Sequence, residues 1–231
     1  SVSTFGDTLT VNGESVIISG VSYTNTPEDI FGQVTDINGN TYQTVQIVNQ
    51  EWMTEDLRAI NFSNGDPITL QTNTNTCNEP AYRDPQGNGS HIYYNGYVIL
   101  DNRNICPSGW HIPSQSDYEV LLDVFGDYDG SQSHWVGSGA ALKSNDPTGG
   151  GYVWTDPLSA TNYSHLSFFP EGMMYCSSNN IYSGNVRSWT TSTQGGGTLY
   201  LDIMENSSSA GFSSHSGAPS TYLSPCRCVK D

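Results

Sequence analysis

Aromatic and polar side chains are frequent in the second half of this 231-residue chain. Sugar-binding sites use both kinds, because flat rings contact the C–H faces of a sugar while amide or carboxylate groups bond to its hydroxyls. Segment 205–224 is also rich in Ser, Gly and Asn with a few aromatic residues, as adaptable binding loops are. The candidate ligand-binding residues are Asn180, Tyr182, Arg187, Asp202, Asn206, His215 and Tyr222.

The histidines form no catalytic pattern. The five residues are scattered along the chain, with no His-Glu-x-x-His motif and no pair at metal-ligand spacing. A Gly-x-Ser-x-Gly nucleophile elbow is also missing from the sequence. We expect His111 to satisfy a backbone hydrogen bond rather than to act as a base, and we expect a protein that is not an enzyme.

The charge balance is strongly acidic. Asp and Glu number 23 against 7 Lys and Arg, and the net charge of −16 argues against nucleic acid and anionic membranes as partners. No apolar run approaches the ~20 residues of a membrane span, so we expect no membrane insertion. Low charge with many hydroxyl and amide residues is typical of secreted β-rich proteins. Since no signal peptide is visible, the chain is either the mature form of an exported protein or a cytosolic protein.

The five cysteines favour a disulfide framework with one thiol left unpaired. None of them forms a Cys-x-x-Cys pair, and Cys226 with Cys228 supplies only two of the four ligands that structural zinc needs. The other three are Cys77, Cys106 and Cys176.

Three hairpins are predicted, because Asn-Gly pairs lie between runs rich in strand-forming residues. The first joins residues 7–11 and 15–19, the second joins 33–37 and 41–47, and the third joins 92–94 and 97–100. In the second hairpin, Asp36, Asn38 and Asn40 place oxygens at alternate positions as a calcium loop does. The required glycine is misplaced and the distal glutamate is missing, so a plain turn is favoured.

One convincing helix is predicted over residues 116–125, with Ser114 as N-cap, Asp117 completing a capping box and Gly126 ending it. A shorter helical piece is expected over 139–144, and span 63–90 is predicted to be a long surface loop. The remaining patterns favour short strands at 167–169, 172–175, 187–191, 198–203 and 227–229. Many short strands with one main helix predict a β-dominant α+β fold.

Several sequence blocks together resemble the Fibrobacter succinogenes major paralogous domain. They lie at residues 34–42, 52–57, 106–114, 160–162, 188–192 and 227–231, so the resemblance runs from about residue 32 to the end. The block Gly-Trp-His-Ile-Pro-Ser at 109–114 is also similar to formylglycine-generating-enzyme-like domains. The resemblance implies a C-type-lectin-like fold with its ends close together, on exported or surface lipoproteins of Bacteroidetes and their relatives.

The resemblance also implies a disulfide between Cys106 and Cys228. For the other cysteines, we prefer a disulfide between Cys176 and Cys226, which leaves Cys77 free. In the alternative, Cys77 forms a disulfide in place of that pair. Trp189 lies in a family block, so we expect it to be buried, and Tyr200 is a further core candidate.

Calcium is the one metal that the sequence favours. C-type lectins bind calcium through Trp-Asn-Asp and Glu-Pro-Asn motifs, and only Trp154-Thr-Asp156 partly matches the first. Asp127 and Asp129 stand two residues apart and, with Asp156, are the candidate ligands, although a solvated turn is the simpler interpretation of each. The many acidic loop residues keep a structural calcium among the expectations, and no other cofactor is indicated.

Two functions follow as hypotheses. The first is an extracellular or cell-surface binding module, adhesin-like, in which residues 31–231 hold a glycan or a protein. The alternative is a structural subunit of a fibre or surface assembly, whose N-terminal segment 1–30 docks on another copy of the chain, since open strand edges accept further strands.

Overall fold

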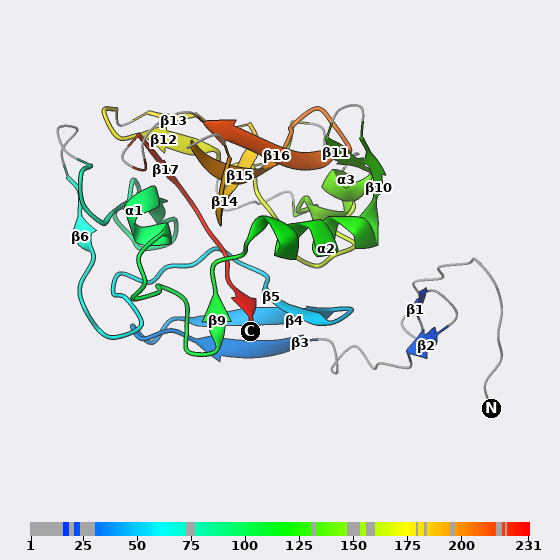
Figure 1. Cartoon of the computed structure of the whole chain (residues 1–231), viewed down its shortest axis with the longest axis horizontal. Coiled ribbons are helices and arrows are strands. Elements are labelled where there is room, and N and C mark those ends of the chain that lie inside the picture. Colours follow the sequence, from blue (N-terminus) through cyan, green and yellow to red (C-terminus); the bar gives the residue numbers. More distant parts are fainter. Residues whose placement is uncertain are drawn as a thin grey trace.

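The computed structural model describes residues 16–18, 21–23, 31–72, 77–130, 133–146, 153–155, 160–178, 180–182, 184–194, 197–215, 219 and 221–231 (Figure 1). Strands dominate these ranges, and the predicted β-dominant α+β class is confirmed. The lectin-like topology stays a prediction. Within the described ranges, no helix is long and apolar enough to cross a bilayer.

One sheet joins the beginning of the domain to the end of the chain. Its strand order is β3 (Phe31–Thr35), β4 (Thr41–Ile47), β5 (Gln50–Met53), β18 (Val229–Lys230) and β9 (Trp110–His111). All of its pairings are antiparallel, and the second predicted hairpin is confirmed as β3 and β4. In Figure 1 the chain after β17 (Tyr222–Ser224) descends from the upper strands to place β18 in this sheet.

In the turn of that hairpin, the side-chain oxygens of Asp36 accept hydrogen bonds from nearby residues. The Asp36 carboxylate accepts hydrogen bonds from the backbone N–H groups of Asn38 and Asn40 and from the Tyr42 hydroxyl, at 2.9, 2.9 and 2.6 Å. Gly39 has a φ of +85°, a left-handed conformation that favours glycine. The expectation of a plain turn rather than a calcium loop therefore agrees with the geometry.

Two further sheets complete the domain, and most of their labelled strands lie in the upper part of Figure 1. The five-stranded sheet has the order β10 (Asp127–Asp129), β11 (His134–Val136), β16 (Ala210–His215), β15 (Gly197–Ile203) and β14 (Val186–Gln194). The six-stranded sheet has the order β13 (Ile181–Tyr182), β12 (Met173–Tyr175), β17 (Tyr222–Ser224), β8 (Tyr93–Asn95), β7 (Ala81–Arg83) and β6 (Thr69–Leu70).

Helix α2 (Gln115–Phe125) lies between the lower sheet and the five-stranded sheet (Figure 1). The Ser114 hydroxyl accepts from the Asp117 N–H, and the Asp117 carboxylate accepts from the Ser114 N–H, so the predicted capping box is confirmed. The Tyr118 ring packs against Trp52 of β5, with centroids 5.2 Å apart. The shorter helix is α3 (Ser138–Leu142), which confirms the helical piece predicted nearby.

The third predicted hairpin is wrong. Only its first half is a strand, β8, and the chain then enters the helix α1 (Gly96–Ile99). The Asn95 side chain accepts a hydrogen bond from the Val98 N–H and caps this helix. Asparagine is common both in hairpin turns and at helix N-caps, and Asn95 forms a helix N-cap here.

Four smaller expectations also need correction. Span 63–90 is not a continuous loop, because it contains β6 and β7. The segment 167–169 contributes only an isolated bridge from Phe168 to Lys143, and the last strand begins at Val229 rather than at residue 227. Segment 205–224 is not simply a loop, since it holds β16 and the whole of β17. Hydrogen bonding to neighbouring strands orders these polar stretches although their composition is typical of loops.

The N-terminal segment contains β1 (Val16–Ile18) and β2 (Val21–Tyr23), which pair antiparallel in a two-stranded sheet. The predicted strand at 7–11 and its Asn-Gly turn lie outside the described residues. β1 falls within the predicted strand at 15–19, and its pairing with β2 was not predicted.

The disulfide between Cys106 and Cys228 is confirmed, with the Cα atoms 6.0 Å apart. The pairing of Cys176 with Cys226 is wrong, because Cys176 bonds to Cys77 and Cys226 keeps a buried free thiol. Cys176 follows β12 and shares a small apolar cluster with Cys77 and Tyr93, whereas Cys226 lies in the main cluster with the other disulfide. The two cysteines therefore belong to different parts of the core.

Arg227 is a buried charged residue that joins three segments of the chain. Its Nε donates to Asp56 Oδ1 at 2.6 Å, and its Nη1 donates to the carbonyl oxygens of Thr54 and Leu166. The guanidinium carbon lies 3.7 Å from the centre of the Phe168 ring. Because a buried charge is costly unless it is paired and hydrogen-bonded, these contacts offset the cost of burying the guanidinium.

Candidate functional site

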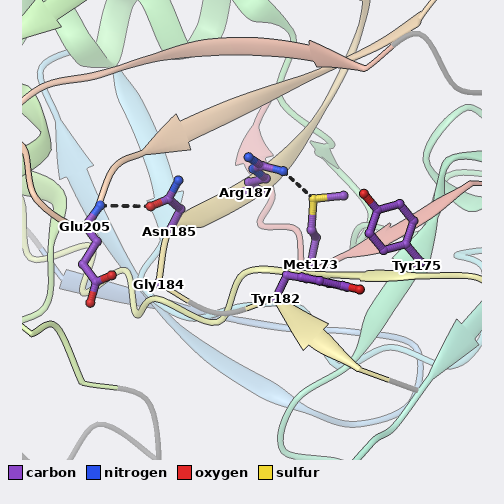
Figure 2. A pocket seen from close by; sticks show the side chains of 7 residues that line it. All are labelled: Met173, Tyr175, Tyr182, Gly184, Asn185, Arg187 and Glu205. Carbon is purple, nitrogen blue, oxygen red and sulfur yellow. Dashed lines mark hydrogen bonds between the residues drawn. The ribbon is translucent and has the colours of Figure 1, made fainter. Parts of the chain in front are cut away.

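A groove opens beside β12, β13 and β14 and the chain that leaves β15, with a volume of about 280 Å³ (Figure 2). One end is aromatic and the other polar. The lining residues are Met173, Tyr175, Tyr182, Gly184, Asn185, Arg187 and Glu205.

The aromatic end of the groove is formed by side chains that lie on one face of β12 and by a residue of β13. Side chains two residues apart share a face of a strand, so Met173 and Tyr175 of β12 both line the groove while Met174 packs into the apolar cluster behind it. Tyr182 of β13 pairs with Met173 across the strands and stays 51% exposed. Its ring meets Tyr175 edge-on, with centroids 5.1 Å apart.

Tyr222 extends this aromatic surface from β17. It lies opposite Tyr175 in the register, and the two ring centroids are 4.9 Å apart. Burial, and then a hydrogen bond with Tyr175 and its charge, raise the pKa of Tyr222, while Arg187 opposes the shift. The hydroxyl therefore stays protonated at neutral pH and can both donate and accept.

Arg187 stands at the centre of the groove. It lies directly opposite Asp202 on β15, with Nε 3.8 Å from Asp202 Oδ2, and its Nη1 lies 2.6 Å from Met173 Sδ (Figure 2). The side chain is 25% exposed, so one part of the guanidinium is held by the protein and another part reaches solvent.

Glu205 and Asn185 form the polar end. The Asn185 amide oxygen accepts from the Glu205 N–H at 3.0 Å (Figure 2). Gly184 adopts a φ of +111°, and a Cβ there would lie 2.9 Å from Glu205 Oε2. A glycine is needed at this position both for the backbone conformation and to leave room for the carboxylate.

A buried lysine fixes the segment that carries Glu205. Lys143 Nζ donates to the carbonyl oxygens of Glu205 and Ser207 at 2.9 and 2.8 Å, and it lies 4.5 Å from the centre of the Trp154 ring. Because two backbone carbonyls are held by one charged donor, this wall of the groove is ordered before any ligand arrives.

The structure brings most of the predicted ligand-binding residues together. Tyr182 and Arg187 line the groove, and Asp202 and Tyr222 contact residues that line it. Asn206 is exposed directly after Glu205. Asn180 is exposed just before β13 but is not among the lining residues, and the side chain of His215 lies outside the described residues.

Sequence reasoning missed Met173, Tyr175, Gly184, Asn185 and Glu205 as site residues. The usable signal was the alternation at 173 and 175, but it becomes informative only once the register with Tyr182 is known. Trp189 and Tyr200 are fully buried, as expected.

The metal candidates do not converge in the described part of the chain. Asp127 and Asp129 lie on the strand β10 rather than in a turn, and Asp156 lies outside the described residues. Among the residues that the structure describes, no group of three or more His, Cys, Asp or Glu side chains is placed to hold a metal ion.

The expected hydrogen bond from His111 to a backbone group is not formed, because its partners are side chains. Its Nδ1 lies 2.7 Å from Asp231 Oδ1 and its Nε2 lies 3.3 Å from Asp117 Oδ2, so the ring bridges two carboxylates instead of a backbone group. This arrangement links β9, the start of α2 and the last residue of the chain. It is a structural link at the surface of the lower sheet.

The family model described as the Fibrobacter succinogenes major domain matches residues 45–230. No match was found among curated proteins or among solved structures. The matched range includes α2, both disulfides and every residue that lines the groove. The chain therefore belongs to the Fibrobacter succinogenes major domain family.

Proposed function

We propose that this domain is a non-catalytic, adhesin-like binding module of an exported or cell-surface protein, and that the groove holds a carbohydrate chain. The observation that carries the proposal is the exposure of Tyr175 and Tyr182 beside Arg187, Asn185 and Glu205. Tyrosine faces cover the apolar side of a sugar ring, and the polar end supplies donors and an acceptor for its hydroxyls.

The contrast with other aromatic residues supports this role. Trp189 and Tyr200 come from the neighbouring strands β14 and β15 and are fully buried. The tyrosines of the groove, on β12 and β13, are instead 36% and 51% exposed. Exposed aromatic residues that cluster beside ordered polar groups mark interaction sites more often than scattered ones do.

The two disulfides support an exported location. Disulfides persist in oxidising compartments and are rare in the reducing cytosol. A groove on such a domain meets surface glycans or secreted proteins, so a protein ligand is the alternative occupant.

A glycan array tests the proposal. We expect the wild-type protein to bind a subset of glycans, and we expect Tyr182→Ala and Tyr175→Ala to lose that binding by at least about tenfold, which corresponds to about 1.4 kcal/mol. Tyr163→Ala is the matched control, because Tyr163 is 59% exposed and does not line the groove. Repeating the array with a chelator tests the calcium expectation. Equal losses for all three variants would contradict a site in the groove.

A structural role is the second candidate. It is favoured by the separate two-stranded sheet of β1 and β2 and by β3, whose outer edge has no strand beside it among the described strands. Light scattering on the full chain and on residues 31–231 tests this role. A large assembly that falls apart on truncation would favour the structural subunit, while two monomers would favour the binding module.

A further inference from the structure

We infer that the groove selects uncharged glycans and rejects glycans that carry carboxylates or sulfates. This inference rests on the proposed function and names the ligand class of the same site. Its basis is the charge in and beside the groove, where Glu205 lines the groove with Arg187 and Asp202 faces Arg187 from β15.

Arg187 is poorly placed to act as an anion receptor. Its Nε faces Asp202 at 3.8 Å, and its Nη1 is directed at Met173 Sδ. A carboxylate bound to the guanidinium would compete with Asp202 and approach Glu205, which lines the same groove. Like charges brought together where water is partly excluded repel strongly, so this cost opposes the gain from the arginine.

The rest of the molecule supplies no compensating positive surface. Six of the seven Lys and Arg residues lie elsewhere, and each already has a partner. Arg58, Arg103, Arg227 and Lys230 pair with carboxylates, while Arg83 and Lys143 bond to backbone carbonyls inside the protein. With a net charge of −16, an approaching anion meets a repulsive field.

An uncharged sugar avoids these costs and uses the same groups. Its hydroxyls can accept from Arg187 and Tyr222 and donate to Glu205, while its ring stacks on Tyr182. The volume of about 280 Å³ is near the lower end for small-molecule sites, so the groove suits the terminal part of a glycan rather than a long stretch.

The test compares matched sugars on one array. The probes are neutral hexose oligosaccharides and the same oligosaccharides with the C6 hydroxymethyl oxidised to a carboxylate. We expect the wild-type protein to prefer the neutral form by at least about tenfold, and we expect Glu205→Gln to narrow that preference. Asp202→Asn gives an independent second reading, and Glu79→Gln is the control, because Glu79 is exposed and lies outside the groove.

Three outcomes are distinguishable. Equal or stronger binding of the oxidised forms would overturn the inference and leave the proposed function standing. A preference that Glu205→Gln and Asp202→Asn do not change would overturn the assignment of these carboxylates as its cause. If the folded wild-type protein bound neither form nor any other glycan on the array, the proposed function itself would fail and the inference with it.

Discussion

Arg227 and Arg187 each face an aspartate, but the two guanidinium groups lie in very different surroundings. Arg227 is 1% exposed, 2.6 Å from Asp56 and surrounded by backbone carbonyls. Arg187 is 25% exposed, 3.8 Å from Asp202 and borders the groove. The same pair of residue types thus joins segments of the core in one region and lies at a partly exposed groove in the other.

The surroundings of the two arginines differ in the same way as the arginines themselves. Arg227 is buried together with the Phe168 ring that it contacts, and Cys106 and Cys228 of the neighbouring disulfide are also fully buried. Around Arg187, tyrosine rings stay open to solvent. We therefore expect substitutions in the first region to change unfolding and substitutions in the second to change binding.

The largest effect is expected from the disulfide between Cys106 and Cys228. It closes a loop with a sequence separation of 122, and the chain-entropy model gives about 4–5 kcal/mol for a loop of that size. The double variant Cys106→Ala/Cys228→Ala should therefore unfold at a temperature lower by several degrees or more, measured by circular dichroism under oxidising conditions. The control is Cys226→Ala, which leaves both disulfides intact. An unchanged melting temperature in the double variant would remove the disulfide from the account of stability.

The next effect separates the two arginines. Arg227→Met leaves Asp56 without its buried partner and should lower the free energy of unfolding by about 3–5 kcal/mol in urea titrations. Arg187→Met, the matched substitution in the groove, should cost no more than about 1 kcal/mol, because its ion pair is longer and partly exposed. Similar losses for the two variants would break the division between the regions.

A smaller effect comes from the start of α2. Burial alone would raise the pKa of Asp117, but hydrogen bonds from Ser114 and from His111 outweigh it, so the pKa lies below its ordinary value. A carboxyl group with a depressed pKa stabilises the folded state above its unfolded pKa of about 3.9, and this contribution is lost as the pH falls through the folded-state pKa. Asp117→Asn should cost about 1 kcal/mol at pH 7 and much less at low pH.

The check for this prediction is the unfolding free energy of both proteins across the acid range. The difference between wild type and Asp117→Asn should shrink as the pH falls. Glu119→Gln, which removes a carboxylate from the same helix, is the control. A difference that stays constant with pH would mean that the charge of Asp117 does not contribute.

The smallest effect on stability is expected in the groove. Tyr182→Ala removes an entire ring that is 51% exposed, yet we expect a loss below about 1 kcal/mol. Tyr94→Phe removes only a hydroxyl, but that hydroxyl is buried and donates to the carbonyls of Leu57 and Ala59, so a loss of about 1–2 kcal/mol is expected. Urea titrations measure the free energy of unfolding of both variants. A larger loss for Tyr182→Ala than for Tyr94→Phe would show that the tyrosines of the groove are part of the core.

Local signals in the sequence were the most reliable. Helix α2 could be predicted because Ser114, Asp117 and the apolar spacing lie within a few turns of one another. Asn95 with Gly96 was misassigned because the same pair suits a hairpin and a helix start, and only packing decides between them. The pairing of Cys77 with Cys176 depends on how β12, β17, β8 and β7 assemble, which no local pattern contains.

The candidate site shows the same limit. Tyr182 and Arg187 were predicted because their residue types suit sugar binding. Met173 and Tyr175 were missed because their place depends on the register between β12, β13 and β17. Glu205 is in the groove because Lys143, 62 residues earlier in the chain, holds its backbone there.

The disulfide between Cys106 and Cys228 also has a mechanical consequence. A pulling force applied between residue 31 and residue 231 follows the chain to Cys106, crosses the disulfide and leaves through the last residues. Full extension of that path is roughly 270 Å, whereas the uncrosslinked chain would extend to roughly 700 Å. Residues 107–227, which contain every residue of the groove, lie outside the shortest load-bearing path. The backbone that carries the groove residues is therefore not itself drawn out when a force extends the first part of the domain.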